Sequence, residues 1–150
     1  MMRKSNRAIT DFEEIRALID KCDTIRLGFA DGQEAYIVPL SFGYEAENGE
    51  FTFYVHGAKA GRRHELAAKN SRVCVEADMC LRFVDQTADY KSFIGSGEIS
   101  EVSGEEAVKG LTLLCRHCGF DGMDCPEAVI NATCVEKIVV REFSAKQRFK

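Results

Sequence analysis

The sequence predicts a mainly β protein with short helices: an antiparallel barrel, closed or nearly closed. First, about six segments rich in β-branched and aromatic residues outnumber the helical segments. Second, Asp31-Gly32 and Asn48-Gly49 are turn signals between neighbouring β-rich runs. Third, 150 residues with 45% hydrophobic content are typical of one globular unit. Residues 1–150 are therefore expected to form a single domain.

The first half of the chain predicts one helix and three strands. The helix covers residues 11–22, because Thr10 can cap it, acidic residues fill its first turn and apolar residues recur at helical spacing. The strands cover three β-rich segments, residues 24–29, 35–44 and 51–56. Two hairpin turns separate them, so they are expected to form a meander.

The second half alternates between helix and strand. Good helix formers predict a helix over residues 61–70, and Pro126 opens another short one. A helix beginning at Gly104 carries one apolar face, formed by Val108, Leu111, Leu114 and Cys115. Further strands are predicted over residues 72–77, 90–100 and 134–143. Gly95 and Gly97 inside the second of these indicate a bulge or a close backbone approach.

Composition excludes several functions. The net charge is −4 and no basic tail is present, so nucleic acid is not an expected partner. The charged N-terminal segment resembles neither a secretory signal nor a membrane anchor, and we expect a cytoplasmic protein that does not bind membranes. Seven cysteines without an export signal are expected to be mostly reduced thiols.

A basic strand-to-helix junction at residues 54–63 is the most informative segment. A helix N-terminus presents free amides and a positive dipole end, which together bind phosphate. Lys59, Arg62 and Arg63 add charged donors. Cations in a first helical turn oppose the dipole, a cost that a bound anion removes. The junction therefore predicts a phosphate site, although on composition alone an ordinary solvated basic turn is the more common explanation of such residues.

Several linked segments, in this order and spacing, carry a family resemblance: residues 26–28, 36–44, 53–63 and 90–97. Together they resemble the nitroimidazole-resistance-like branch of the pyridoxamine 5'-phosphate oxidase-like split-barrel superfamily, over roughly residues 3–148. The family pattern usually has Ser where Gly57 stands and Lys where Arg63 stands. Losing the hydroxyl removes one possible phosphate donor, whereas Arg63 keeps the charge.

This resemblance implies an FMN-binding split barrel that forms a homodimer, with FMN at the subunit interface. It implies a flavin-dependent oxidoreductase acting on a small molecule, by analogy a nitro-aromatic compound. The expected phosphate contacts are His56, Ala58, Lys59, Arg62 and Arg63. The expected isoalloxazine contacts are Val38, Pro39 and Leu40, with Ser92 and Phe93 as further candidates. No acid–base dyad is evident, and none is required, because flavin carries the redox chemistry itself.

The residues are also consistent with two other functions. One is a non-catalytic flavin carrier or sensor, and the other is a zinc module built on Cys115, Cys118, Cys125 and Cys134. Cys115 and Cys118 lie in one amphipathic segment and can equally be core residues, so no metal site is predicted. His64, in a polar helix, is expected at the surface. His117 is expected to contact either helix-end carbonyls or substrate.

Overall fold

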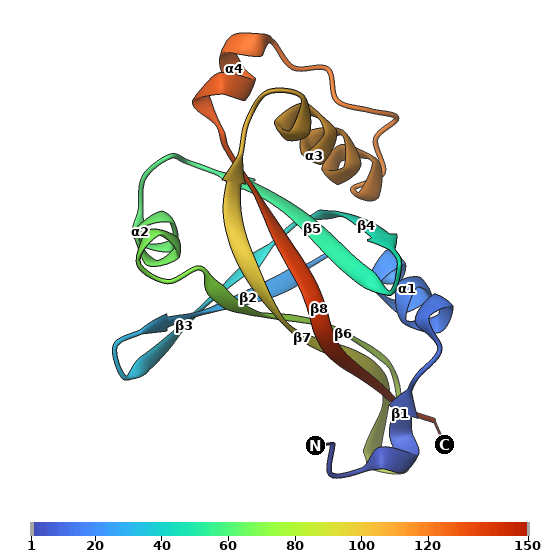
Figure 1. The fold of residues 1–150 in the computed structure, drawn as a ribbon. Helices are drawn as coiled ribbons and strands as arrows, with labels where there is room; N and C mark the ends of the chain where they lie inside the picture. The colour runs from blue at the N-terminus through green and yellow to red at the C-terminus, as the bar shows by residue number, and fades with distance from the viewer. Residues whose placement is uncertain (1, 150) are drawn as a thin grey trace.

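Eight strands form one antiparallel sheet in the computed structural model, which describes residues 2–149 (Figure 1). The strands are β1 (Ala8–Ile9), β2 (Ile25–Asp31), β3 (Glu34–Leu40), β4 (Gly43–Glu47), β5 (Glu50–Gly57), β6 (Arg72–Val84), β7 (Thr87–Val102) and β8 (Cys134–Arg148). The helices are the 3-10 turn η1 (Ser5–Arg7) and the α-helices α1 (Phe12–Lys21), α2 (Arg62–Lys69), α3 (Gly104–His117) and α4 (Glu127–Ala132). The mainly β, antiparallel prediction is confirmed.

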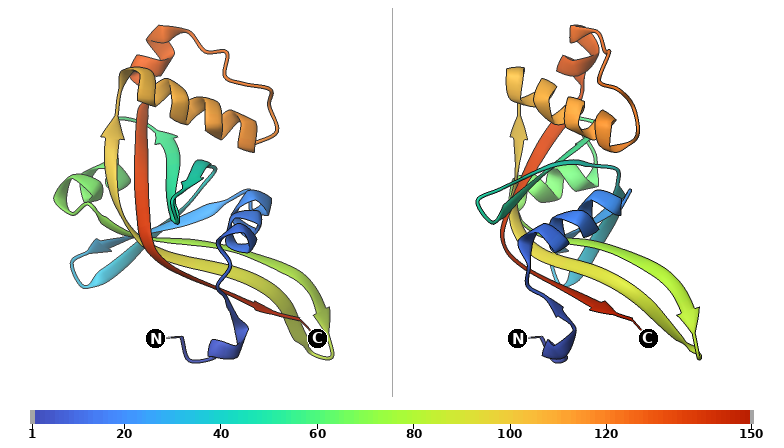
Figure 2. Two further views of the ribbon diagram at one scale, coloured as in Figure 1. Left: turned by 45° about the vertical axis from the view of Figure 1, so that its right-hand side comes forward. Right: turned by 90° about the vertical axis from the view of Figure 1, so that its right-hand side faces the viewer.

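The sheet is open rather than closed. Its strand order is β3-β2-β6-β7-β8-β5-β4, with β1 added beside β8, so β3 and β4 are the two ends of the path. Figure 2 shows β6, β7 and β8 as long strands that curve around the molecule. This curvature wraps the sheet around a core without joining its ends, so of the two expected forms, closed or nearly closed, the fully closed one is excluded.

The predicted strand over residues 35–44 is two strands. β3 pairs with β2, and β4 pairs with β5, so the predicted three-strand meander is also wrong. Phe42, between them, is fully buried. Gly43 follows, where a side-chain carbon would lie within 2.8 Å of the Leu114 Cα in α3. The chain therefore turns inward at Phe42, and α3 packs directly against the Gly43 backbone.

Apolar residues on α1 and the inner sheet face form the main core. Ile15, Leu18 and Ile19 of α1 are buried, as the helical spacing predicts, while the N-cap is Asp11 rather than Thr10. Its carboxylate accepts a hydrogen bond from the Glu14 amide at 3.2 Å. Aromatic rings from β5, β7 and β8 pack beside the helix: Phe51, Phe53 and Phe93 are buried, and Phe143 is half-buried.

Helix α3 covers the sheet where β5 and β8 meet. Ala107 and Leu111 pack with Val135 of β8, whereas Val108, predicted on this apolar face, is 41% exposed. Strands β6 and β7 are longer than predicted, because they continue into a hairpin at Asp85 and Gln86, both with positive φ. None of the helices within residues 2–149 is long and apolar enough to cross a membrane.

Candidate functional site

The junction between β5 and α2 combines an exposed loop with an exposed helix start. His56 is near the end of β5 and, like Ala58 and Lys59, is exposed to solvent. Gly61 is the N-cap of α2, with φ +118°, and within the described chain no side chain caps this helix start. The first-turn amides of α2 therefore remain available to an anion.

Arg62 ties the start of α2 to the β2–β3 hairpin. Its guanidinium donates to Asp31 at 2.5 Å and lies 4.3 Å above the centre of the Tyr36 ring. Half of the Arg62 side chain is nevertheless exposed. A guanidinium in this position can exchange one anionic partner for another without leaving a buried charge unpaired.

Arg63 points in the opposite direction, into the protein. It forms an ion pair with Glu136 of β8, and the two side chains are only 14% and 4% exposed. The guanidinium occupies the space that a side-chain carbon at position 57 would need. Gly57 and Arg63, the two departures from the family pattern, therefore fit together: the small residue makes room for the larger cation.

Beneath α2, His64 lies against β8. Its Nδ1 is 3.8 Å from the Sγ of Cys134, which is fully buried. Burial, and then the charge of Glu136, raises the pKa of the Cys134 thiol to about 11. The prediction that His64 lies at the surface is wrong, because His64 is half-buried on the face of this short helix that packs against the sheet. Its spacing of three from Ala67, also half-buried, is the signal that could have revealed this.

The predicted isoalloxazine residues lie on the edge strand β3. Val38 and Leu40 are half-buried against the core, while Pro39 points to the opposite, solvent-exposed face. Their side chains therefore do not form one surface, although the strand's outer backbone edge is continuous through all three.

The two further candidates lie on β7, with different surroundings. Ser92 is half-buried, whereas Phe93 is fully buried, with its ring 5.5 Å from that of Phe51 and 5.4 Å from that of Phe143. The side chain of Phe93 is thus part of the hydrophobic core.

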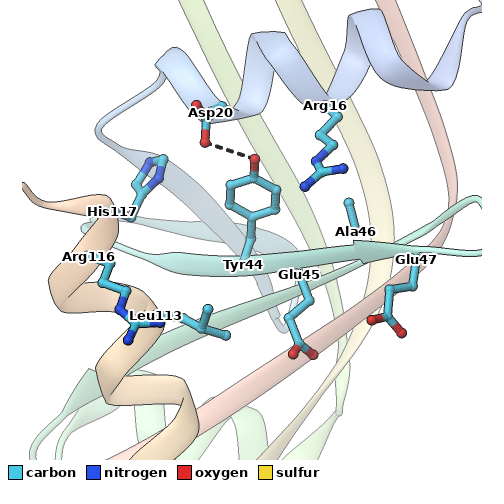
Figure 3. A pocket seen from close by; sticks show the side chains of 9 residues that line it. All are labelled: Arg16, Asp20, Tyr44, Glu45, Ala46, Glu47, Leu113, Arg116 and His117. Atoms are coloured by element: carbon cyan, nitrogen blue, oxygen red, sulfur yellow. Dashed lines mark hydrogen bonds between the residues drawn. The ribbon is translucent and has the colours of Figure 1, made fainter. Parts of the chain in front are cut away.

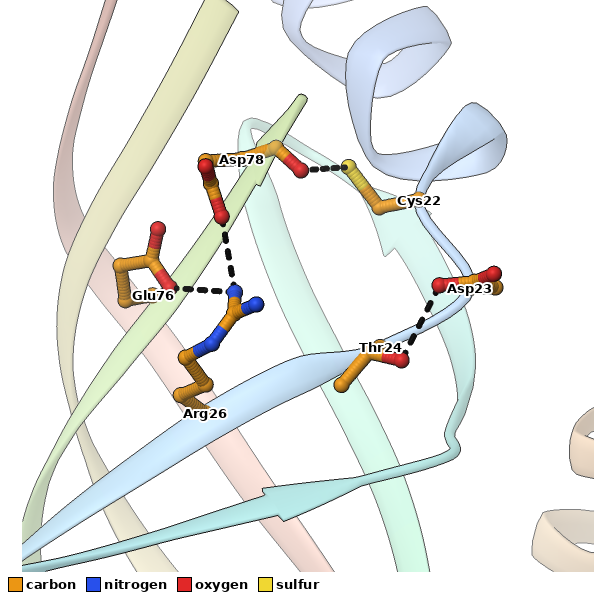
Figure 4. A network of polar contacts seen from close by, with 6 residues as sticks. All are labelled: Cys22, Asp23, Thr24, Arg26, Glu76 and Asp78. Atoms are coloured by element: carbon orange, nitrogen blue, oxygen red, sulfur yellow. Dashed lines mark hydrogen bonds and ion pairs between the residues drawn. The ribbon is translucent and has the colours of Figure 1, made fainter. Parts of the chain in front are cut away.

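An apolar groove of about 590 Å³ runs over the outer face of β2, β3 and β6, and the sequence did not reveal it. Gly28, Ile37 and Cys74 are among its lining residues, and so are Arg26 and Glu76, which belong to a charged network (Figure 4). In that network Arg26 donates to Glu76 at 3.0 Å and to Asp78 at 2.7 Å. Burial raises the pKa of Glu76.

A second, polar pocket of about 390 Å³ lies between α1, β4 and the end of α3 (Figure 3). The Tyr44 hydroxyl donates to Asp20 at 2.9 Å, and Arg16 and Arg116 are among the other residues that line the pocket. The His117 Nε2 lies 2.6 Å from the carbonyl oxygen of Cys22, the C-cap residue of α1. His117 thus contacts a helix-end carbonyl, which is one of its two predicted roles.

The four cysteines of the alternative zinc module do not lie together as one group of metal ligands. Throughout residues 2–149, one group of three possible metal-ligating side chains lies within 4.8 Å, and it comprises His64, Cys134 and Glu136. Cys115, Cys118 and Cys125 are free thiols outside this group.

A family model described as pyridoxamine 5'-phosphate oxidase matches residues 11–147. The match covers most of the open antiparallel sheet and the junction between β5 and α2. This chain is therefore a member of the pyridoxamine 5'-phosphate oxidase-like family. A comparison with curated proteins gave no match.

Solved structures share the fold. One, from Bacteroides thetaiotaomicron VPI-5482, is provisionally described as a 5-nitroimidazole antibiotic resistance protein; it is 25% identical, with a TM-score of 0.84 over 93% of this chain and 86% of that chain. A FAD-binding protein from Mesorhizobium loti is 20% identical, with a TM-score of 0.68 over 95% and 98% of the two chains. The flavocytochrome Anf3 from Azotobacter vinelandii is 20% identical, with a TM-score of 0.71 over 100% and 73%. The last two likenesses concern the fold alone.

Proposed function

We propose that this protein binds FMN, with the phosphate at the junction of β5 and α2. The observation that carries the proposal is the uncapped start of α2, in a segment where His56, Lys59 and Arg62 are exposed. A phosphate there accepts hydrogen bonds from the helix amides and gains the charge of Arg62 and Lys59. The membership of the chain in a family with a FAD-binding structural relative supports a flavin cofactor.

The two arginines have different roles in this proposal. Arg62 is exposed and releases Asp31 to bind the phosphate, whereas Arg63 keeps its ion pair with Glu136 and supports the loop from below. The flavin ring lies along the free backbone edge of β3 at Val38–Leu40, where the carbonyl of Pro39 can accept a hydrogen bond from the polar edge of the ring, although Pro39 has no N–H to donate. When bound, the flavin supplies hydride or electron transfer.

We also propose that the protein forms a homodimer, with the flavin site at the interface between the two subunits. The outer sheet face exposes aliphatic side chains, with Ile37 63% and Ile94 50% exposed, beside the apolar groove. Exposed apolar side chains around an apolar groove are typical of an interface. A twofold dimer through this face would cover them and enclose a flavin on β3.

The activity we propose is oxidoreduction of a small molecule, with nitro-aromatic compounds as the first class to test. The support is the similarity to the Bacteroides thetaiotaomicron protein and its provisional description. Anaerobic reduction of the bound flavin by a nicotinamide, followed by reoxidation with a nitroimidazole, tests the activity. Flavin binding without reoxidation would favour the alternative, a flavin carrier or sensor.

The phosphate site is tested by titrating the protein with FMN, FAD and riboflavin while following flavin fluorescence. Arg62→Ala should weaken FMN about ten- to hundredfold and leave riboflavin, which lacks the phosphate, almost unchanged. Arg141→Ala is the matched control, because Arg141 is also an exposed arginine in an ion pair with a glutamate. Equal FMN affinity in the folded Arg62→Ala variant and the parent would contradict the site.

A further inference from the structure

Three potential metal ligands converge between α2 and the sheet, on the side of α2 that faces the protein, and a further carboxylate lies nearby. Cys134 and Glu136 are two apart on β8, so their side chains point to the same face. His64 reaches them from α2. Glu101 of β7 lies directly opposite Glu136 in the strand register, and its charge acts on the Cys134 thiol. The group unites a thiol, an imidazole and carboxylates from three elements distant in sequence.

The spacing of these atoms is close to that of a coordinated ion. The Cys134 Sγ and His64 Nδ1 are 3.8 Å apart, and the ligand atoms of His64, Cys134 and Glu136 all lie within 4.8 Å of one another. In a tetrahedral zinc site, metal–ligand bonds of about 2.0–2.3 Å place sulfur and nitrogen roughly 3.5 Å apart. Adjustments of about an ångström or less in side-chain positions would complete that geometry.

The carboxylates around His64 and Cys134 also favour binding of a cation. Glu101 and Glu136 are carboxylates directly opposite each other on adjacent strands, an arrangement that is destabilising by itself. Glu136 is almost fully buried, and its ion pair with Arg63 balances one of the two negative charges. A divalent ion would offset the remaining charge and provide a partner for the buried sulfur.

We propose that His64, Cys134 and Glu136 bind a divalent transition metal of the Zn²⁺ class. Nitrogen, sulfur and oxygen donors together suit zinc, whereas Mg²⁺ and Ca²⁺ prefer oxygen alone. Glu101 or a water molecule takes the fourth position.

Arg63 is a positioning residue in this site. It hydrogen-bonds to Oε1 of Glu136 and so orients the carboxylate, as outer-sphere partners of metal ligands do. The metal site lies beneath α2, while the proposed flavin phosphate lies at the exposed start of the helix. The metal proposal does not depend on the flavin.

The experiment uses the full chain, freed of metal by a chelator and then given one equivalent of ZnCl₂ or CoCl₂. We expect one tightly held ion per chain after dialysis. Bound Co²⁺ should show tetrahedral d–d absorption and a near-ultraviolet thiolate-to-metal band. Cys134→Ser should abolish the thiolate band and weaken Zn²⁺ at least about tenfold. Cys118→Ser, which removes an exposed thiol, is the control and should leave both unchanged.

A measurement on the unsubstituted protein keeps the test decisive if Cys134→Ser fails to fold. In a low concentration of urea, in which local opening exposes buried thiols, Zn²⁺ should selectively slow the alkylation of Cys134, located by peptide mass spectrometry, while Cys118 reacts as before. His64→Ala should remove this protection. If the parent retains no ion, or if Co²⁺ binds without a thiolate band, the cluster is only a network of ion pairs and the proposal is wrong.

Discussion

Arg62 and Arg63 are adjacent in sequence but differ in their surroundings. The Arg62 side chain is half exposed and is shared between Asp31 and the Tyr36 ring. Arg63 is enclosed against Glu136. Consecutive helical positions point about 100° apart, so one arginine faces solvent while the next faces the sheet. The sequence grouped both as phosphate ligands, whereas its burial indicates a structural role for Arg63.

Arg63→Ala should lower the free energy of unfolding by about 3–5 kcal/mol, because it leaves the buried carboxylate of Glu136 without its partner. Arg62→Ala breaks an exposed, solvent-screened ion pair and should cost far less. Urea unfolding of the two variants and the parent measures both values. Similar losses for the two variants would contradict the difference in burial.

The buried thiol of Cys22 predicts a loss of stability in alkali. Burial first, and then the charge of Asp78, raises its pKa from 9.0 to about 11. Between these values the unfolded chain has lost the thiol proton that the folded chain keeps, so stability falls as pH rises through this window, and below about pH 9 the effect is absent. Its size is on the order of 2 kcal/mol.

Chemical unfolding at several pH values between 8 and 11 measures this dependence. The decline should be shallower in Cys22→Ala than in the parent, whereas Cys118→Ala, at an exposed position, should follow the parent. Parallel curves for Cys22→Ala and the parent would mean that Cys22 is not the responsible group.

At the level of elements, α3 is fixed against β4 and β5 by glycines on both sides of the contact. Gly43 of β4 meets the α3 backbone, and Gly110 of α3 meets the Tyr54 ring. Lys109 adds an ion pair to Glu45 at 2.7 Å. Close backbone approach thus holds this helix on the sheet.

Gly43→Ala should therefore destabilise the protein by about 1–3 kcal/mol or more, since its methyl group would overlap Leu113 and Leu114 backbone atoms, which cannot move independently of α3. Gly122→Ala is the matched control, because nothing lies within 4 Å of the added carbon there. Thermal unfolding measures both. A Gly43→Ala variant as stable as the control would show that α3 can shift without cost.

For the whole molecule, the curved open sheet has two unlike faces. The inner face carries the aromatic core and α1, and the outer face carries the groove and exposed Ile37 and Ile94. An open sheet also leaves β3 and β4 as unpaired edges. Both features support the proposed dimer, in which a second copy covers the apolar outer face.

Sedimentation velocity should find a dimer, and Ile37→Glu should shift it toward monomer because a charge would be buried in the interface. Val108→Glu is the control, because Val108 is an exposed aliphatic residue on α3, away from this face. A parent protein that stays monomeric at saturating FMN would exclude the dimer.

The sequence by itself determined the mainly β class, α1 with its buried face, and the strand-to-helix junction at residues 54–63. These follow from local periodicity and turn chemistry, which neighbouring residues decide. It did not determine that residues 35–44 divide between opposite ends of the sheet, because α3, 70 residues later, fills the space beside Gly43. Nor could it bring His64 to Cys134 and Glu136. That contact depends on the packing of α2 against β8, and contacts so distant in sequence are set by the tertiary fold alone.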